Sequence, residues 1–146
     1  IGITPCPAVK IPFDDVGWKL FSESDQNLES RKEVFRLSTS NRYTESWYTY
    51  INEESSSSRN PEAFRAYLDS WVNYEFVGDI EGCEIPIKVI AGAYDQDLNA
   101  EVMRNTYGVW MKNCEIVELA DCGHYPMFEA PLRLAAEIES FLNQQH

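Results

Sequence analysis

Two residues of this sequence combine a reactive side chain with a position in which it could act on a substrate. His124 lies in ADCGHYPMFEAP (Ala120 to Pro131), behind a glycine and ahead of a proline, and Asp95 lies in GAYDQDLN. A carboxylate that accepts a hydrogen bond from one imidazole nitrogen fixes the histidine tautomer and leaves the other nitrogen free to take a proton. We therefore expect Asp95 to orient His124, and His124 to serve as a general base.

Each of the two residues follows a segment with the pattern of a buried strand. IPIKVIAG (residues 85–92) precedes Asp95, and CEIVELA (residues 114–120) precedes His124. Near-continuous apolar runs are typical of parallel strands that are covered on both faces, and ligands and catalytic groups gather at the carboxyl ends of such strands. If the two strands are neighbours, Asp95 and His124 lie on adjacent loops at the same edge of the sheet.

The segments around these strands predict an α/β architecture. Asn99 or a neighbour can cap a helix after the first strand, and Pro131 opens a last helix. Apolar residues share one face of each helix: Met103, Tyr107, Trp110 and Met111 in the first, and Leu134, Ala135, Ile138, Phe141 and Leu142 in the second. Strand, helix, strand and helix in alternation indicate a parallel sheet, and we expect residues 1–4 to join it as a third strand.

Residues 14–78 form a second region, rich in aromatic and polar residues, with several helix signals. The clearest is NPEAFRAYLDSWVNYEF, in which Asn60 is a good N-cap and Pro61 suits the first turn. Residues 54–59, just before it, predict a polar loop. We therefore divide the chain into a sheet strand with its loop (residues 1–13), a helical region (residues 14–78) and a strand–helix region (residues 79–146).

The composition disfavours two classes of binding partner and a membrane span. The sequence has 24 Asp and Glu residues against 12 Lys and Arg, a net charge of −12. This charge disfavours nucleic acid and anionic membrane surfaces, which attract Lys and Arg. No apolar run approaches the roughly 20 residues of a membrane span, and four cysteines without a CxxC pair favour free thiols in a reducing compartment. These features predict a soluble, cytoplasmic protein that acts on a small molecule.

Simpler roles for the same residues stay open. A loop histidine can bond to backbone alone, and aspartate favours turns because its side chain bonds to nearby amides. Asp97 is close enough in sequence to take the place of Asp95. Cys114, Cys122 and His124 offer three metal ligands, but zinc sites use four at regular spacing, so we expect no metal and no cofactor. Cys122 is disfavoured as a nucleophile because it shares a loop with its candidate base.

Taken in order, these motifs resemble the C-terminal half of an α/β-hydrolase. In that family the acid of the catalytic triad stands in a G-x-x-D turn after the penultimate strand, and the histidine stands in a G-H loop before the final helix. The matching residues are Gly92 and Asp95, then Gly123 and His124, with Pro126, Glu129 and Pro131 behind them. ITPCP (residues 3–7) resembles the sixth strand, and residues 14–78 stand where a helical cap is usually inserted. The resemblance favours Asp95 over Asp97 as the acid, and we expect Gly123 to permit the close approach of the histidine loop.

The nucleophile of that family is missing from this sequence. It normally stands at a strand-to-helix elbow of the type G-x-S-x-G, and no such motif occurs in the 146 residues. The resemblance implies that the nucleophile and the oxyanion hole lie upstream of Ile1, so we expect the chain alone to be inactive. Because the open edge of a parallel sheet is prone to aggregate, we expect an N-terminal fragment of the same protein to pair with the first strand. Self-pairing into a homodimer is the alternative.

The resemblance implies a hydrolase, and we expect a serine carboxylesterase that acts on a small, fairly apolar ester. His124 would take the proton of the nucleophile and then activate water, while Asp95 orients the imidazole. Among the aromatic residues, Trp47, Trp71 and Tyr125 are the candidates for a substrate pocket. An aspartate at the elbow would instead give an epoxide hydrolase or a dehalogenase, and loss of the elbow would leave a non-catalytic binding protein of the same fold.

Overall fold

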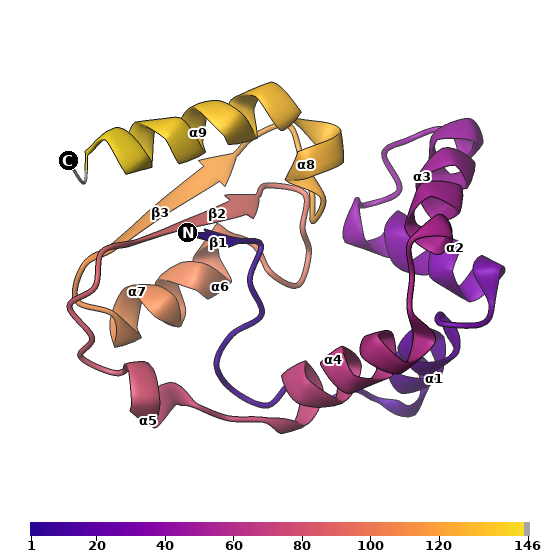
Figure 1. Ribbon diagram of the computed structural model, residues 1–146, viewed down its shortest axis with the longest axis horizontal. Helices are drawn as coiled ribbons and strands as arrows, with labels where there is room; N and C mark the ends of the chain where they lie inside the picture. Colours follow the sequence, from indigo (N-terminus) through magenta and orange to yellow (C-terminus); the bar gives the residue numbers. More distant parts are fainter. Residues whose placement is uncertain (145–146) are drawn as a thin grey trace. The chain divides into compact units, whose positions relative to one another are not determined.

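The computed structural model describes residues 1–144, so the second histidine, His146, lies outside the described residues. The chain forms two compact units (Figure 1). One contains Ile1–Pro7 together with the chain from Val77 onward, and the other is Ala8–Phe76. The first unit carries both candidate catalytic residues. Among residues 1–144, no helix is both long and apolar enough to cross a membrane.

A parallel sheet forms the centre of the first unit. Within the described residues it has three strands, β1 (Gly2–Ile3), β2 (Ile87–Gly92) and β3 (Cys114–Leu119), in the order β1-β2-β3. β2 is therefore the central strand, and its Ile90 is paired with Ile3 on one side and with Val117 on the other. The parallel α/β sheet and its third strand, both predicted from the sequence, are confirmed.

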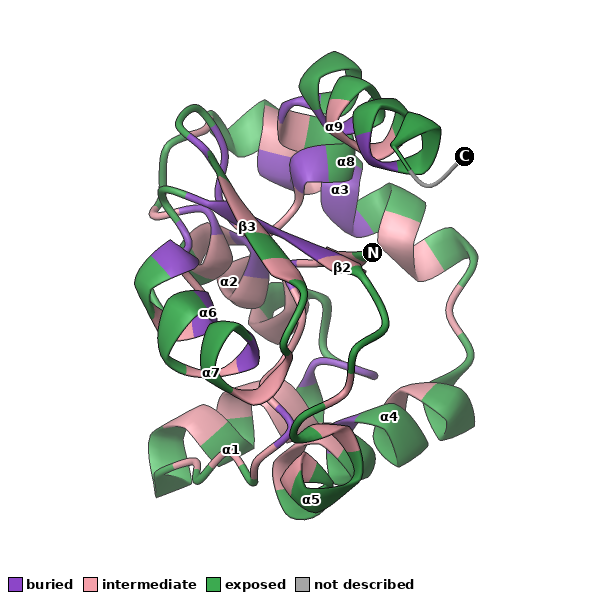
Figure 2. Ribbon diagram, turned by 90° about the vertical axis from the view of Figure 1, so that its left-hand side faces the viewer, coloured by how far each residue is buried: buried purple, intermediate pink, exposed green. Residues whose placement is uncertain are grey.

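Side chains of β2 alternate between two hydrophobic cores, one on each face of the sheet. α6 (Ala100–Asn105) and α7 (Tyr107–Trp110) cover one face, and α9 (Pro131–Asn143) covers the other (Figure 1). The buried members are Val89, Ala91, Ala100, Met103 and Tyr107 in the first core, and Ile90, Leu119, Cys122, Ala130 and Leu134 in the second. Figure 2 shows that β2 is more deeply buried than β3. Full burial of one aliphatic side chain contributes about 1.5–3 kcal/mol to the free energy of folding. The two cores therefore hold β2 firmly, and with it the strand end from which the Asp95 loop starts.

The helix expected after β2 is interrupted. α6 begins after Asn99, whose side chain accepts hydrogen bonds from the amides of Glu101 and Val102 as an N-cap. At Thr106 the backbone leaves the helical conformation (φ −118°, ψ −91°), and α7 starts as a separate turn. The prediction of one helix through residues 103–111 is therefore wrong. The Thr106 hydroxyl donates to the carbonyl of Val102 at 2.7 Å, the kind of local side-chain bond that competes with regular helix.

The second unit, Ala8–Phe76, is helical. Its helices are α1 (Asp15–Glu23), α2 (Leu28–Ser38), α3 (Glu45–Ser57) and α4 (Pro61–Asn73), whereas the short α5 (Val77–Ile80) and α8 (Pro126–Glu129) belong to the first unit. The side chains of Asp14, Asn27, Thr44 and Asn60 cap the four long helices. α3 runs on to Ser57, so the predicted polar loop over residues 54–59 is wrong for most of its length. The Ser57 hydroxyl bonds within the helix, to the carbonyl of Glu54.

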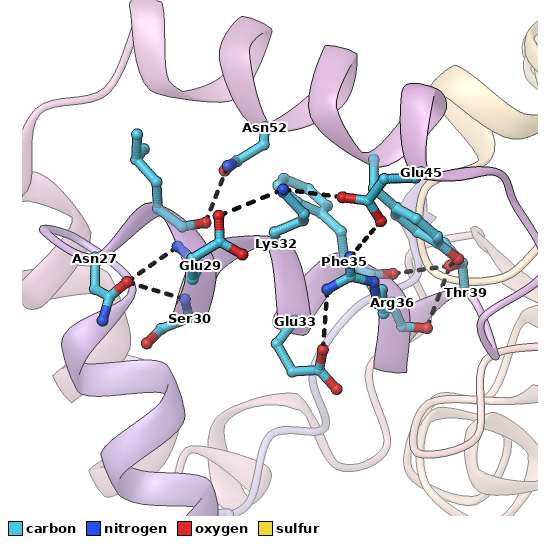
Figure 3. A network of polar contacts seen from close by, with 12 residues as sticks. Asn27, Glu29, Ser30, Lys32, Glu33, Phe35, Arg36, Thr39, Glu45 and Asn52 are labelled. Carbon is cyan, nitrogen blue, oxygen red and sulfur yellow. Dashed lines mark hydrogen bonds and ion pairs between the residues drawn. The ribbon is translucent and has the colours of Figure 1, made fainter.

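Polar contacts join α2 to α3 in this helical unit (Figure 3). Glu45, at the start of α3, forms ion pairs with both Lys32 and Arg36 of α2. In the buried part of the same contact, the hydroxyls of Thr39 and Tyr48 lie 3.0 Å apart. Exposed ion pairs contribute little on their own, so we attribute the stability of this contact mainly to its buried side chains.

Candidate active site

The loops that follow β2 and β3 are hydrogen-bonded to each other at one edge of the sheet. The amide of Ala93 donates to the carbonyl of Leu119 at 2.9 Å, and the amide of Tyr94 donates to the carbonyl of Cys122 at 3.0 Å. Because parallel strands end at the same edge of a sheet, the loops begin as neighbours. These two hydrogen bonds keep them together beyond the strand ends.

This close approach of the loops requires a glycine at the end of β2. A Cβ atom on Gly92 would lie 2.0 Å from the carbonyl oxygen of Gly123 and 2.5 Å from that of Cys122. Both oxygens belong to the backbone, which cannot turn aside as a long side chain would. The structure therefore shows a steric requirement for glycine at Gly92, and the role expected of Gly123 stays a prediction.

The carboxylate of Asp95 is held in place by its own turn. It is buried, and its Oδ1 accepts hydrogen bonds from the amides of Leu98 at 2.9 Å and Asp97 at 3.2 Å. Its other oxygen, Oδ2, lies 2.7 Å from Nδ1 of His124. One oxygen therefore fixes the carboxylate while the second faces the imidazole. Asp97 supplies a backbone amide to this turn, and the structure pairs His124 with Asp95.

His124 is the partly exposed member of the pair. Its side chain is 28% exposed, against 4% for that of Asp95. Since a carboxylate accepts hydrogen bonds, Nδ1 is the donor in this short contact, and the lone pair of a neutral imidazole with this tautomer lies on Nε2. No group among residues 1–144 hydrogen-bonds to Nε2. A partly exposed imidazole whose Nδ1 contacts a buried carboxylate is the arrangement that general-base catalysis needs.

Two further residues contact the backbone around His124, and the sequence motifs predict this role for neither of them. Thr4, directly after β1, donates through its hydroxyl to the carbonyl of His124 at 3.0 Å. Glu129 accepts through its carboxylate from the amides of Gly123 and Tyr125, each at 2.8 Å. Glu129 stands in the histidine motif and could have been singled out there. Thr4 is 120 residues away, and no local pattern points to it.

Cys6 is affected by the charge of Asp95, and Tyr107 is hydrogen-bonded to the backbone of Cys6. Burial raises the pKa of the Cys6 thiol, and the negative charge of Asp95 raises it further. Burial is also the main cause that raises the pKa of the Tyr107 phenol, whose hydroxyl donates to the carbonyl of Cys6 at 2.6 Å.

The cysteines near the site form no metal cluster in the part of the chain that the structure describes. None of the four cysteines forms a disulfide within the described residues, and Cys122 is fully buried, with its sulfur 3.9 Å from the carbonyl of Leu119. Among residues 1–144, no group of three or more His, Cys, Asp or Glu side chains is arranged to hold a metal ion.

The three aromatic residues named as pocket candidates have different surroundings. Tyr125 lies next to His124, with the two ring centroids 5.0 Å apart in an edge-on arrangement. Trp47 stacks on Tyr43 within the helical unit, with centroids 4.2 Å apart. Trp71 packs edge-on against Phe13 and Phe21 in the same unit. Tyr125 is thus in direct contact with the candidate base, whereas the two tryptophans take part in aromatic packing within the helical unit.

Comparison with known proteins gives matches at the level of structure. No protein-family model matches the sequence, and no curated protein matches it. A probable hydrolytic enzyme from Pseudomonas aeruginosa PAO1 aligns over 94% of this chain and 53% of its own, with a TM-score of 0.61 and 14% identity. An N-acyl homoserine lactone degrading enzyme aligns over 82% of this chain and 49% of its own, with a TM-score of 0.60 and 13% identity.

A third solved structure names the fold. It is an alpha/beta hydrolase enzyme from a Medee basin deep-sea metagenome library, which aligns over 88% of this chain and 49% of its own, with a TM-score of 0.57 and 19% identity. This chain has part of the α/β-hydrolase fold. It spans about half the length of the three solved structures.

The two candidate residues stand after neighbouring strands of this α/β-hydrolase fold. Asp95 follows the central strand β2, and His124 follows β3 and precedes the last helix. This is the order of acid and histidine that the sequence motifs imply. At identities of 13–19%, the similarity establishes the fold of this chain. Because one fold supports many reactions, the reaction depends on the residues of the site.

Proposed function

We propose that this chain supplies the acid and the base of an α/β-hydrolase that cleaves an ester or a related bond in a small, fairly apolar substrate. The observation that carries the proposal is the 2.7 Å contact between Nδ1 of His124 and Oδ2 of Asp95. It leaves Nε2 of a partly exposed imidazole available to take a proton. The solved structures of similar fold are described as hydrolytic enzymes, which supports hydrolysis as the class of reaction.

The proposed reaction has two stages that use His124 in opposite directions. Nε2 first takes the proton of a nucleophilic hydroxyl, whose oxygen attacks the acyl carbon, and then gives that proton to the departing alcohol. In the second stage Nε2 takes a proton from water, whose oxygen attacks the acyl-enzyme, and returns the proton to the nucleophile. Asp95 stabilises the imidazolium that forms in each stage and keeps the proton on Nδ1.

The nucleophile is proposed to come from polypeptide outside these 146 residues. The sequence contains no G-x-S-x-G elbow, and the chain corresponds to about half of each similar structure. The partner that we propose is an N-terminal fragment of the same protein, which would pair with β1 at the edge of the described sheet and supply the nucleophile. The chain alone is then expected to be inactive, and a second copy of the chain is the other candidate for that edge.

The helical unit is proposed to act as the cap of the enzyme. Tyr125, beside His124, is proposed to contribute apolar surface to the substrate pocket. A cap of this kind would select for small, fairly apolar substrates, because aromatic side chains offer much apolar surface and few hydrogen bonds.

The decisive experiment uses the chain assembled with the polypeptide that carries the nucleophile. A fluorophosphonate probe, which labels activated serines, is expected to label the assembled protein, and His124→Ala is expected to abolish labelling and turnover while the fold is kept. His146→Ala, which changes the other histidine, is the matched control. A chain that retains full turnover without His124 would contradict the proposed role of this residue.

The acid can be tested in the same assembled protein by a second matched pair of variants. Asp95→Asn is expected to lower kcat by about 10⁴-fold, the typical effect of removing the carboxylate from a triad. Asp97→Asn should keep most of the activity, because Asp97 contributes a backbone amide to the turn. No fluorophosphonate labelling, under conditions where a control esterase is labelled, would reject the serine nucleophile. The epoxide hydrolase or dehalogenase chemistry and the non-catalytic binding protein would then remain.

A further inference from the structure

The peptide group that follows His124 is held at both of its ends. Its carbonyl oxygen, on His124, accepts a hydrogen bond from Oγ1 of Thr4 at 3.0 Å. Its amide, on Tyr125, donates to Oε1 of Glu129 at 2.8 Å. Rotation of this one peptide group would therefore break the hydrogen bonds to both Thr4 and Glu129.

Glu129 also binds the amide of the residue that precedes His124. Its second oxygen, Oε2, accepts from the amide of Gly123 at 2.8 Å. The lengths fall in the range of charge-assisted hydrogen bonds, which are about twice as strong as neutral ones. Glu129 is the last residue of α8, so a single turn of helix folds its carboxylate back onto the loop that precedes it. The amides of both neighbours of His124 are therefore bound to one side chain.

Thr4 reaches this loop because the backbone after β1 adopts an unusual conformation. The residue is buried and has φ 42°, in the left-handed region that β-branched residues avoid. Its amide donates to the carbonyl of Ile90 on β2 at 2.7 Å, so the pairing of β1 with β2 keeps it in place. A costly backbone conformation that is held by the surrounding structure is a common feature of functional sites.

We propose that Thr4 and Glu129 are positioning residues that hold Nδ1 of His124 against Asp95. Together they fix the backbone on both sides of the histidine and so restrict where its Cβ points. The consequence for catalysis rests on the proposed function, in which His124 is the base. A base that is misplaced by about 1 Å can lose about 100-fold in rate. The consequence for the imidazole itself does not depend on turnover, since the Nδ1–Oδ2 contact exists within this chain.

The test is an NMR measurement of the proton that His124 Nδ1 shares with Asp95, in the full 146-residue chain. A short hydrogen bond to a carboxylate moves this proton to low field and slows its exchange with water. With two histidines in the sequence, the resonance can be assigned by its persistence in His146→Gln. We expect Thr4→Val and Glu129→Gln each to shift the resonance or to broaden it beyond detection.

Matched variants separate positioning from a general loss of stability. Thr4→Val keeps the shape and the β-branched backbone preference of threonine, and Thr4→Ser restores the hydroxyl, so serine should recover the wild-type resonance. Thr39→Val removes another buried hydroxyl, which donates to the carbonyl of Phe35 at 2.8 Å in the helical unit. It should lower the thermal midpoint without moving the His124 resonance. Glu129→Gln keeps the size of the side chain, but the glutamine can accept through one oxygen only, and its amino group would face a backbone amide.

Retention of the wild-type resonance in both Thr4→Val and Glu129→Gln would overturn the proposal, as would an equal effect of Thr39→Val. In the assembled enzyme we expect kcat to fall about tenfold in Thr4→Val, with KM nearly unchanged, and to recover in Thr4→Ser. If no turnover is found in any assembly but the resonance responds as described, the hydrolase assignment fails and the positioning role stands. If turnover is found and the resonance does not respond, the positioning role fails alone.

Discussion

A Cβ atom at Gly92 would lie 2.0 Å from the carbonyl oxygen of Gly123. The backbone of the histidine loop therefore occupies the space that any other residue at the end of β2 would need. Three residues later the same turn presents Asp95, whose Oδ2 lies 2.7 Å from Nδ1 of His124. The glycine of the G-x-x-D turn thus permits the loop contact that brings acid and base within hydrogen-bonding distance.

Gly92→Ala is expected to push the two loops apart. Added atoms in a packed site commonly cost about 1–3 kcal/mol, and here the obstructing atoms are backbone, so the free energy of unfolding should fall by at least this much. The Nδ1 proton resonance of His124 should shift or disappear at the same time. Chemical denaturation and NMR measure the two effects.

Gly78→Ala is the matched control for this substitution. Gly78 lies in α5, and a Cβ there would meet no atom within 4 Å. Because alanine favours helix over glycine by about 0.8–1 kcal/mol, this variant should be as stable as the wild type or slightly more so. Gly92→Ala with unchanged stability and an unchanged His124 resonance would show that the loops adjust freely, against the steric argument.

The pairing of Asp95 with His124 is a part of the site that the sequence predicts well. Each residue follows an apolar run, and the register aligns the last residues of both strands, Gly92 with Leu119. Parallel neighbours that end together bring the next residues close, whatever the details of their side chains. The catalytic roles of the two residues stay predictions until activity is measured.

Other features depend on contacts that no local pattern carries. Thr4 has a backbone φ of 42°, and its hydroxyl donates to the carbonyl of His124, which lies 120 residues further along the sequence. The break at Thr106 reflects a side-chain bond that competes with helix, although the apolar spacing continues across it. Lys88 stands in an otherwise apolar strand, and its partners come from β3 and α9. Each of these follows from tertiary structure rather than from composition or periodicity.

The thiol of Cys6 gives a chemical measure of the charge on Asp95. Burial raises the pKa of Cys6 above its ordinary value of 9.0, and the charge of Asp95 adds to this effect because it disfavours the thiolate. Asp95→Asn removes the charge, so the pKa should fall and the fraction of thiolate at about pH 8 should rise. Since the thiolate is the reactive form, alkylation of Cys6 by iodoacetamide should become severalfold faster, as measured by mass spectrometry.

Two controls distinguish the charge from a loosening of the loops. His124→Ala breaks the same pair but keeps the carboxylate, so it should leave the alkylation rate of Cys6 unchanged. Burial alone raises the pKa of Cys114, and its rate should be the same in the wild type and both variants. Equal acceleration of Cys6 in Asp95→Asn and His124→Ala would mean that exposure, not charge, governs the reaction.

Lys88 forms a buried ion cluster on the face of the sheet that α9 covers. Its ammonium group lies 3.0 Å from Oε1 of Glu115 and 3.1 Å from Oε2 of Glu137, and the Lys88 side chain is 2% exposed. Its charge also lies 5.9 Å from the centroid of the Phe141 ring. Burial lowers the pKa of Lys88, but the hydrogen bonds and charges of the two glutamates outweigh burial and raise it above the ordinary 10.5.

This raised pKa predicts the direction in which stability depends on pH. The folded chain holds the Lys88 proton more tightly than the unfolded chain, so the contribution to stability is fully present below about pH 10.5 and is lost as the pH rises through the folded pKa. Lys88→Met keeps an apolar side chain of similar length and cannot titrate. In denaturation series at increasing pH, the wild-type free energy of unfolding should therefore fall more steeply than that of Lys88→Met above about pH 10.5. Cys6 and Tyr107 also have raised pKa values, but they titrate in both proteins and cancel in the difference. Parallel curves for the two proteins would show that the glutamates do not stabilise the charged form of Lys88.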